Sequence, residues 1–117
     1  MVTERFHHIL DLENCNGNIE DPKALISFVE KIASAIEMKI IGGPIIQEGV
    51  RDNPGLSVLA LVDLSHISVH TFTKYKEALV DVFSCKEYDK EKVLEISKEF
   101  FATPETKIRH KEVWWGK

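Results

Sequence analysis

The chain has 117 residues, of which 44% are hydrophobic and 29% are charged, a balance typical of folded globular proteins rather than disordered ones. Its formal net charge is −4 and its basic residues are dispersed, which argues against a surface for nucleic acid. No run of 18 apolar residues is present, and the N-terminus lacks the apolar core of a signal peptide. We therefore expect a single cytoplasmic domain over residues 1–117, with neither nucleic acid nor membrane as a partner.

The first half of the chain predicts a strand, a helix and a second strand. Phe6–Glu13 is rich in Phe, Ile and Leu and indicates a strand, which an Asn- and Gly-rich turn follows. Asp21-Pro22 has the pattern of an N-cap and first helical residue, and apolar residues then recur at spacings of three and four as far as Ile36. Met38–Ile41 predicts the next strand.

Glycine and proline interrupt that second strand. It should bend or end at Gly42-Gly43-Pro44 and resume only briefly at Ile45-Ile46. The polar stretch Gln47–Pro54 then predicts a loop.

The second half predicts three more strands, one helix and a final strand. Leu56–Val62 is almost continuously apolar, as in a strand covered on both faces. Ser65–Phe72 alternates, which places His66 and His70 on one face of a strand, and Ala78–Cys85 is again of strand type. The last two predicted elements are a helix that is N-capped by Asp89 and stops before Pro104, and a strand over Lys107–Trp115.

This order of elements predicts the α+β class. Two helices packed on one face of an antiparallel sheet form a two-layer α/β sandwich, the natural way to bury both amphipathic surfaces. The other face of the sheet must then be covered by solvent-tolerant residues or by a partner.

Reactive side chains are concentrated between Gly55 and Cys85, and several common chemistries fit them poorly. A metal site is not expected, because histidines four residues apart on a strand are separated by about 13 Å. Ser65, His70 and Asp63 could suggest a hydrolase triad, but no G-x-S-x-G turn accompanies them. Cys85 with a histidine could form a thiol nucleophile pair, again without a local signature. The two cysteines, 70 positions apart, do not make a disulfide framework.

Three blocks of this region together resemble the prokaryotic S-adenosylmethionine decarboxylases. The blocks are Gly55-x-Ser57, Ser65-His66-Ile67-Ser68-Val69-His70-Thr71 and Asp81-Val82-Phe83-Ser84-Cys85. The family carries Glu-Ser-His…Ile-His-Thr-Trp-Pro-Glu followed by Asp-x-Phe-Thr-Cys. Its spacings recur here: eight residues from Ser57 to Ser65, five from Ser65 to His70 and twenty from Ser65 to Cys85. With His7, Cys15, the two helices and the length, the resemblance covers nearly the whole chain.

The resemblance implies a cofactor made from the chain itself. The backbone would break between Leu64 and Ser65, leaving Ser65 as a pyruvoyl group, with His70 and Ser57 assisting the elimination. The pyruvoyl ketone would form a Schiff base with an amino-acid-type substrate and accept the electrons released on loss of CO₂. Cys85 would return a proton to the substrate carbon.

The sequence also departs from the family around these residues. Leu64 stands where the family has Glu, and Phe72-Thr73-Lys74 replaces Trp-Pro-Glu. Arg51 lies in the loop where the family has an aromatic that stacks on adenine. S-adenosylmethionine carries a sulfonium cation, so each positive side chain added at contact distance would weaken its binding by about 1–4 kcal/mol. The carboxylates of Asp11 and Glu13 on the first strand could offset part of that loss. The predicted substrate-binding residues are Phe72, Lys74, Arg51, Asp11 and Glu13.

These features predict a homodimeric pyruvoyl-dependent decarboxylase that acts on S-adenosylmethionine in polyamine (spermidine) biosynthesis. One alternative is a pyruvoyl decarboxylase of another amino acid, such as arginine or ornithine. A second alternative is an unprocessed paralogue that has lost catalysis and acts as a partner or regulatory subunit.

Overall fold

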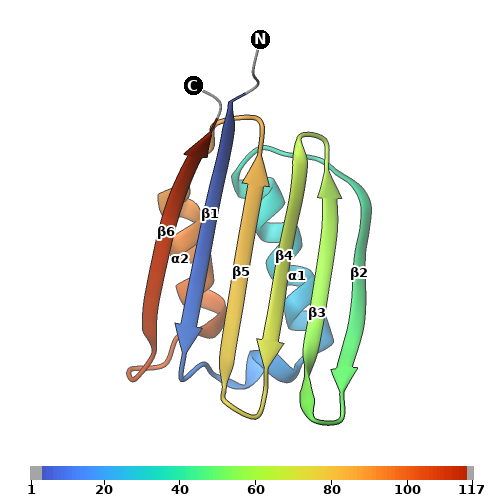
Figure 1. Cartoon of the computed structure of the whole chain (residues 1–117), viewed down its shortest axis with the longest axis vertical. Coiled ribbons are helices and arrows are strands. Elements are labelled where there is room, and N and C mark those ends of the chain that lie inside the picture. Colours follow the sequence, from blue (N-terminus) through green and yellow to red (C-terminus); the bar gives the residue numbers. More distant parts are fainter. Residues whose placement is uncertain (1–3, 116–117) are drawn as a thin grey trace.

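A computed structural model of the protein describes residues 4–115 and shows one six-stranded sheet with two helices on one face (Figure 1). The strands lie in the order β2-β3-β4-β5-β1-β6, and every neighbouring pair is antiparallel. The elements are β1 (Arg5–Glu13), a short 3-10 helix (Gly17–Glu20), α1 (Pro22–Ala35), β2 (Ile40–Val50), β3 (Asn53–Val62), β4 (Ser65–Phe72), β5 (Glu77–Ser84), α2 (Lys90–Phe101) and β6 (Lys107–Trp115). The predicted α+β sandwich is confirmed.

Both helices begin where the sequence predicted. The Asp21 carboxylate accepts a 3.0 Å hydrogen bond from the backbone N–H of Lys23, and Pro22 is the first residue of α1. The Asp89 carboxylate accepts an equivalent 3.0 Å bond from the N–H of Glu91 at the start of α2. Each cap satisfies a backbone donor that the first turn of a helix leaves without an internal partner.

The predicted loop over Gln47–Pro54 is wrong. β2 continues to Val50 and β3 begins at Asn53, so only Arg51 and Asp52 form the turn between them. β2 is one of the two edge strands of the sheet and is exposed from Gln47 to Val50, so polar residues are tolerated there.

Of the two outcomes expected at the glycines of β2, a bend or an end, the strand does not end there. The strand passes through Gly42-Gly43-Pro44, and shifts in its pairing with β3 on both sides of Gly42 absorb the irregularity. An added Cβ at Gly43, where φ is +83°, would lie 2.7 Å from the carbonyl oxygen of Leu59, which explains the glycine.

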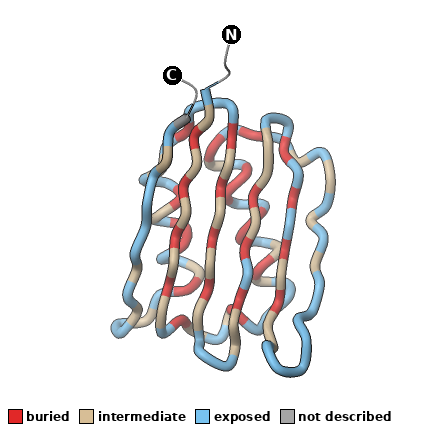
Figure 2. The backbone as a smooth tube through the Cα atoms, viewed as in Figure 1, coloured by how far each residue is buried: buried red, intermediate tan, exposed pale blue. Residues whose placement is uncertain are grey.

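The core lies between the sheet and the helices. Alternate residues along β1, β4 and β5 are buried, which Figure 2 shows as a regular alternation of colour along these strands. The largest fully buried side chains include Phe28 from α1 and Phe101 from α2, whose ring centroids are 4.8 Å apart.

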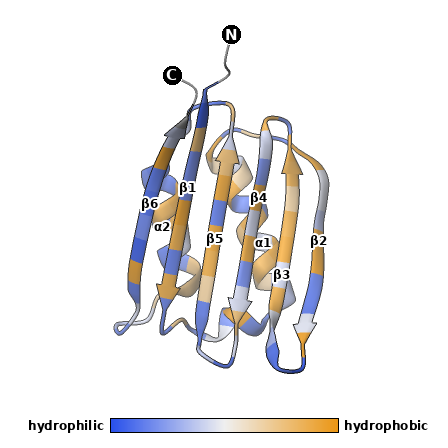
Figure 3. Ribbon diagram, viewed as in Figure 1, coloured by the Kyte–Doolittle hydropathy of each residue, from blue (hydrophilic) through white to orange (hydrophobic). Residues whose placement is uncertain are grey.

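The opposite face of the sheet carries no helix, and we call it the open face. Its β2–β3 side is apolar: Ile45, Leu59 and Leu61 are 62%, 41% and 50% exposed. Figure 3 shows the contrast between the largely hydrophobic β3 and the largely hydrophilic β6. Among residues 4–115, no helix is long and apolar enough to cross a membrane.

Candidate active site

The predicted cleavage bond lies at the tip of the β3–β4 hairpin. Asp63 and Leu64 form the turn, and Ser65 is the first residue of β4. The carbonyl oxygen of Leu64 accepts a 3.1 Å hydrogen bond from the backbone N–H of Cys85. On the other side, the N–H of Asp63 donates a 2.9 Å bond to the carbonyl oxygen of Lys39. The turn is therefore held by backbone contacts from two neighbouring segments.

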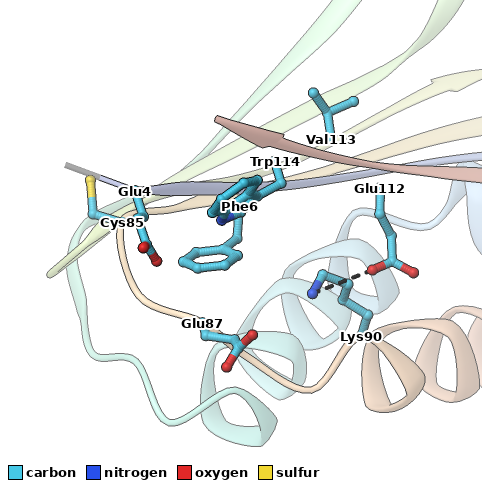
Figure 4. Close-up of a pocket in the computed structure, with 8 residues that line it drawn as sticks. All are labelled: Glu4, Phe6, Cys85, Glu87, Lys90, Glu112, Val113 and Trp114. Carbon is cyan, nitrogen blue, oxygen red and sulfur yellow. Dashed lines mark ion pairs between the residues drawn. The ribbon is translucent and has the colours of Figure 1, made fainter. Parts of the chain in front are cut away.

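Cys85 lies at this same end of the sheet, immediately after β5, and is exposed. It lines a cavity of about 550 Å³ together with two aromatic and several charged side chains (Figure 4). Phe6 and Trp114 supply the aromatic rings, and Glu4, Glu87 and Glu112 the carboxylates. The Lys90 ammonium lies 3.3 Å from Glu112 and 5.6 Å from the centroid of the Phe6 ring.

Burial distinguishes the two cysteines. Cys15 is buried, and burial raises the pKa of its thiol to about 11. A thiol with so high a pKa is a poor proton donor or nucleophile near neutral pH, whereas Cys85 is open to solvent.

Ser57 and His70 form a hydrogen-bonded pair on the open face. The two residues lie directly opposite each other on β3 and β4, and Ser57 Oγ is 2.7 Å from His70 Nδ1. They line a groove of about 480 Å³ whose other side chains include His66 and Leu59. The prediction that His66 and His70 share a face of the strand is confirmed.

Ser65 and His70 do not meet within one chain. They are five residues apart on β4, which corresponds to about 16 Å along the strand. The side chain of Ser65 also has the parity of Ile67 and Val69, which are buried beneath the helices, whereas His70 is exposed on the open face. The structure thus joins Leu64, Ser65 and Cys85 in one group and Ser57 with His70 in another.

Three of the predicted substrate-binding residues lie at the end of the sheet opposite Ser65. Arg51 is in the β2–β3 turn, Phe72 ends β4, and Lys74 is in the β4–β5 turn, all at the lower end in Figure 1. Arg51 is almost fully exposed beside Asp52, and the Lys74 ammonium lies 5.6 Å from the centroid of the Tyr75 ring. Within one chain, these residues are on the Ser57–His70 side.

Asp11 and Glu13 already have a partner. The Arg109 guanidinium Nη2 lies 2.9 Å from a carboxylate oxygen of each. The hydrogen bond from Arg109 to Asp11, with the charge of Glu13, raises the pKa of the guanidinium above its ordinary value. This pairing joins β1 to β6 on the surface of the sheet.

The sequence analysis missed a cluster on the open face next to Ser65. His7 Nε2 is 2.7 Å from Asp81 Oδ1, and His66 Nε2 is 3.8 Å from the same oxygen. Both imidazoles also contact the ring of Phe83. The residues come from β1, β4 and β5, so period-two alternation could identify their faces but not the strand pairing that brings them together. Within residues 4–115, no group of three or more His, Cys, Asp or Glu side chains is arranged to hold a metal ion.

The fold is that of an adenosylmethionine decarboxylase. The crystal structure of the adenosylmethionine decarboxylase from Aquifex aeolicus superposes with a TM-score of 0.70, covering 95% of this chain and 91% of that one, at 19% sequence identity. The model of the S-adenosylmethionine decarboxylase family matches residues 6–112. The chain therefore belongs to that family and is a carboxy-lyase of this kind, as the sequence resemblance implied.

Proteins similar to this chain are named as decarboxylases of two different substrates. An S-adenosylmethionine decarboxylase proenzyme of Clostridium botulinum is 27% identical over 114 residues, which are 96% of this chain and 94% of that one. An arginine decarboxylase proenzyme of Caldivirga maquilingensis is 35% identical over 72 residues, 62% of this chain. That match spans 54% of the Caldivirga protein, about half its length.

Proposed function

We propose that this chain cuts itself between Leu64 and Ser65 and decarboxylates an amino-acid-type substrate with the pyruvoyl group formed at Ser65. The observation that carries the proposal is the 3.1 Å hydrogen bond from the Cys85 N–H to the Leu64 carbonyl oxygen. That donor is aimed at the atom on which negative charge develops when Ser65 Oγ attacks the carbonyl carbon, so it stabilises the transition state.

The cutting reaction uses only groups of the chain. Attack by Ser65 Oγ transfers the acyl group of Leu64 from the nitrogen of Ser65 to its oxygen, which leaves an ester and a free amine. Removal of the α-proton of Ser65 then breaks the Cβ–Oγ bond, and Leu64 departs as a carboxylate. Loss of the nitrogen as ammonia, with one water consumed, leaves the pyruvoyl group at the start of residues 65–117. The Ser57–His70 pair is suited to removing the α-proton, because the hydroxyl orients the imidazole.

The proposed cut lies at a point where the pyruvoyl group formed at Ser65 would stay in the folded protein. Residues 57–62 of β3 remain paired with residues 65–70 of β4 whether or not the turn between them is closed. Cutting a hairpin at its tip therefore leaves both fragments in one sheet, and the new chain end remains beside Cys85. The Glu that the family has at position 64 is not needed for this step, because the acyl transfer uses the backbone carbonyl.

The pyruvoyl group, when formed, supplies a ketone that binds the substrate amine and withdraws electrons as CO₂ leaves. Cys85 is the proton donor in this proposal, since it is exposed and adjacent in space to the cut bond. The cavity beside it is lined by two aromatic rings and three carboxylates, and the Lys90 ammonium already lies against the Phe6 ring and Glu112. The Trp114 ring, Glu4 and Glu87 are therefore the lining groups that favour a substrate with a cationic side chain.

S-adenosylmethionine is the first candidate substrate, with polyamine (spermidine) biosynthesis as its context, because the Clostridium relative of that name matches nearly the whole chain. Arginine is the second candidate, supported by the partial match to the Caldivirga arginine decarboxylase proenzyme. A sulfonium and a guanidinium are both cations that aromatic faces and carboxylates attract, so the Cys85 cavity suits either.

We also propose that the active unit is a homodimer. One chain holds two half-sites at opposite ends of its sheet, one with Ser65 and Cys85 and the other with Ser57 and His70. A second copy packed on the open face with its strands reversed would set each half-site against the complementary half of its neighbour. Such packing would also cover the exposed Ile45, Leu59 and Leu61.

Intact mass measurement and a denaturing gel test the proposal. The purified protein should resolve into residues 1–64 and residues 65–117, and the second fragment should begin with a carbonyl group that reacts with phenylhydrazine. Ser65→Ala should remain one chain. CO₂ release from S-adenosylmethionine, arginine and ornithine then separates the candidate substrates. A wild-type protein that stays uncut on prolonged incubation would contradict the decarboxylase proposal and favour a non-catalytic partner or regulatory subunit.

A further inference from the structure

One aromatic residue on the open face is enclosed by two histidines of neighbouring strands. Phe83 of β5 lies directly opposite His7 of β1 on one side and His66 of β4 on the other. The His66 ring stacks on Phe83 at a centroid distance of 5.5 Å and an interplanar angle of 27°, and the His7 ring meets it edge-on at 5.2 Å. Asp81 Oδ1 lies beside both imidazoles, 2.7 Å from His7 and 3.8 Å from His66. The proposed reaction uses none of these four side chains.

His66 is set apart from His7 by its place in the chain. It is the residue after Ser65, and its contact partner Phe83 is two residues before Cys85 on β5. The His66–Phe83 contact is therefore made by the residue next to the one that the proposed cut converts, and it joins β4 to the strand that leads to the proposed proton donor.

Cleavage changes what holds residue 65. Before the cut, a peptide bond ties it to the turn that Lys39 and Cys85 hold in place. After the cut, it is the end of a chain, and chain ends fray unless they are tied down. The proton must still be delivered between residue 65 and Cys85, and a misplacement of about 1 Å can cost a hundredfold in rate.

We propose that His66, held by Phe83 and Asp81, is a positioning residue that keeps the chain end made by cleavage in register with Cys85. This inference rests on the proposed self-cleavage. The stack on Phe83 fixes the plane of the ring, and the Asp81 carboxylate, 3.8 Å from His66 Nε2 and beyond hydrogen-bond distance, adds an electrostatic attraction at that edge of the imidazole. The other side chain opposite His66 is the apolar Leu61 of β3, so among the described residues Asp81 is the titratable group beside it, and His7 lies across β5 on the other side of Phe83.

Three variants of the full-length chain test this role. His66→Ala removes both contacts, and His66→Phe keeps a ring to stack on Phe83 but loses the polar ring edge beside Asp81. His7→Ala is the matched control, because His7 contacts the same Phe83 and Asp81 from β1, far in sequence from the cut. Cleavage is followed by gel, CO₂ release is measured on S-adenosylmethionine and arginine per phenylhydrazine-reactive carbonyl, and hydrogen exchange is measured at the amides of residues 66–69.

His66→Ala should be cut at a rate within about threefold of wild type, because the tether is intact before the cut. Its kcat per carbonyl should fall by about ten- to a hundredfold with little change in KM. Hydrogen exchange at residues 66–69 should be faster in the cut His66→Ala protein than in cut wild type. It should not be faster in the double variant His66→Ala/Ser65→Ala, which remains uncut, than in Ser65→Ala. His66→Phe should fall between His66→Ala and wild type, and His7→Ala should resemble wild type.

Two results would overturn the role of His66 while leaving the proposed function standing. One is a cut His66→Ala protein with wild-type kcat and wild-type hydrogen exchange, and the other is a fall in kcat in His7→Ala equal to that in His66→Ala. Accelerated exchange in the uncut chain as well would reduce His66 to a general stabiliser of β4. A wild-type protein that is never cut would overturn the proposed function together with this inference.

Discussion

The backbone N–H of Cys85 donates a 3.1 Å hydrogen bond to the carbonyl oxygen of Leu64. In the proposed function, Cys85 therefore takes part in both reactions, through its backbone amide during cutting and through its thiol during turnover. The amide is present whatever side chain stands at position 85, so the two contributions can be separated by substitution.

Cys85→Ala should preserve cutting and damage turnover. The amide that stabilises attack on Leu64 remains, whereas the proton donor is lost, and general acid catalysis typically contributes about 10²–10⁴-fold. We expect cutting within a few-fold of wild type and a kcat for CO₂ release lowered by at least about a hundredfold. Cutting is read from the gel and kcat from the initial rate per carbonyl.

Cys15→Ala is the control for that experiment, because Cys15 is buried and outside both half-sites. It should lower stability through the lost packing while leaving cutting and kcat unchanged at 25 °C. If Cys85→Ala stopped cutting altogether, the thiol rather than the amide would be the group that matters at Leu64.

Mixing two inactive chains tests the reversed homodimer. His70→Ala lacks one half-site and Ser65→Ala lacks the other, so neither should be cut efficiently alone. If each site draws Ser65 from one chain and His70 from its neighbour, co-expression restores one complete site in each mixed dimer. About half of the His70→Ala chains should then be cut, because about half of them pair with Ser65→Ala when the chains assemble at random.

A failure of complementation has a definite meaning. Each variant should first be shown to dimerise by sedimentation, and co-purification of two differently tagged chains should show that mixed dimers form. If mixed dimers form and no chain is cut, then Ser65 is not served by the His70 of a neighbouring copy, and the separation of about 16 Å along β4 would have to be bridged within one chain.

The sequence predicted those parts of the fold that local chemistry decides. Asp21-Pro22 and Asp89 start the helices because a cap acts within one turn, and the alternation in β4 placed His66 and His70 on one face because side chains of a strand alternate. β2 was predicted too short, because an edge strand exposed to solvent has no hydrophobic pattern to mark it.

Non-local pairing explains what the sequence left open. β1 comes first in the chain but lies between β5 and β6, so nothing in its own residues shows that His7 meets Asp81 or that Asp11 meets Arg109. The family resemblance grouped Ser57, Ser65, His70 and Cys85 by role, whereas the register of β3, β4 and β5 divides them between two ends of the sheet.

Gly55→Ala should destabilise the protein strongly. A Cβ at this position would lie 1.8 Å from the carbonyl oxygen of Thr71, so β3 and β4 would have to move apart. Thr71 also accepts a 3.0 Å bond from the Leu56 N–H and donates a 2.8 Å bond to the Ile19 carbonyl, so the disturbance reaches the core. We expect a loss of at least about 2–3 kcal/mol, or about 10 °C in Tm by calorimetry.

Gly17→Ala is the matched control, because a Cβ there meets no atom within 4 Å. Its Tm should stay within about 2 °C of wild type. Because Gly55 is two residues from Ser57, Gly55→Ala should also slow cutting at temperatures where the protein is still folded, and Gly17→Ala should not. Equal Tm values for the two variants would show that β3 and β4 can separate at Gly55 at little cost.

Stability should fall in acid because of His8. This histidine is fully buried between the sheet and α2, and burial, with the neighbouring His110, lowers its pKa to about 4. The unfolded chain takes up the same proton near pH 6.5, so between these values only the unfolded state is protonated. The contribution of His8 is thus fully present above about pH 6.5 and is lost as pH falls toward 4, by an amount on the order of 3 kcal/mol.

His8→Leu should flatten that part of the stability curve. The substitution removes the 3.1 Å bond between His8 Nε2 and His110 Nδ1, but it also removes His8 Nδ1, a buried atom without a hydrogen-bond partner. Urea unfolding of both proteins from pH 7.5 to 4.5 gives the difference in unfolding free energy at each pH. That difference should shift in favour of His8→Leu as pH decreases, because carboxylates common to both chains cancel. Parallel curves would show that the folded protein accepts the proton on His8 as readily as the unfolded chain does.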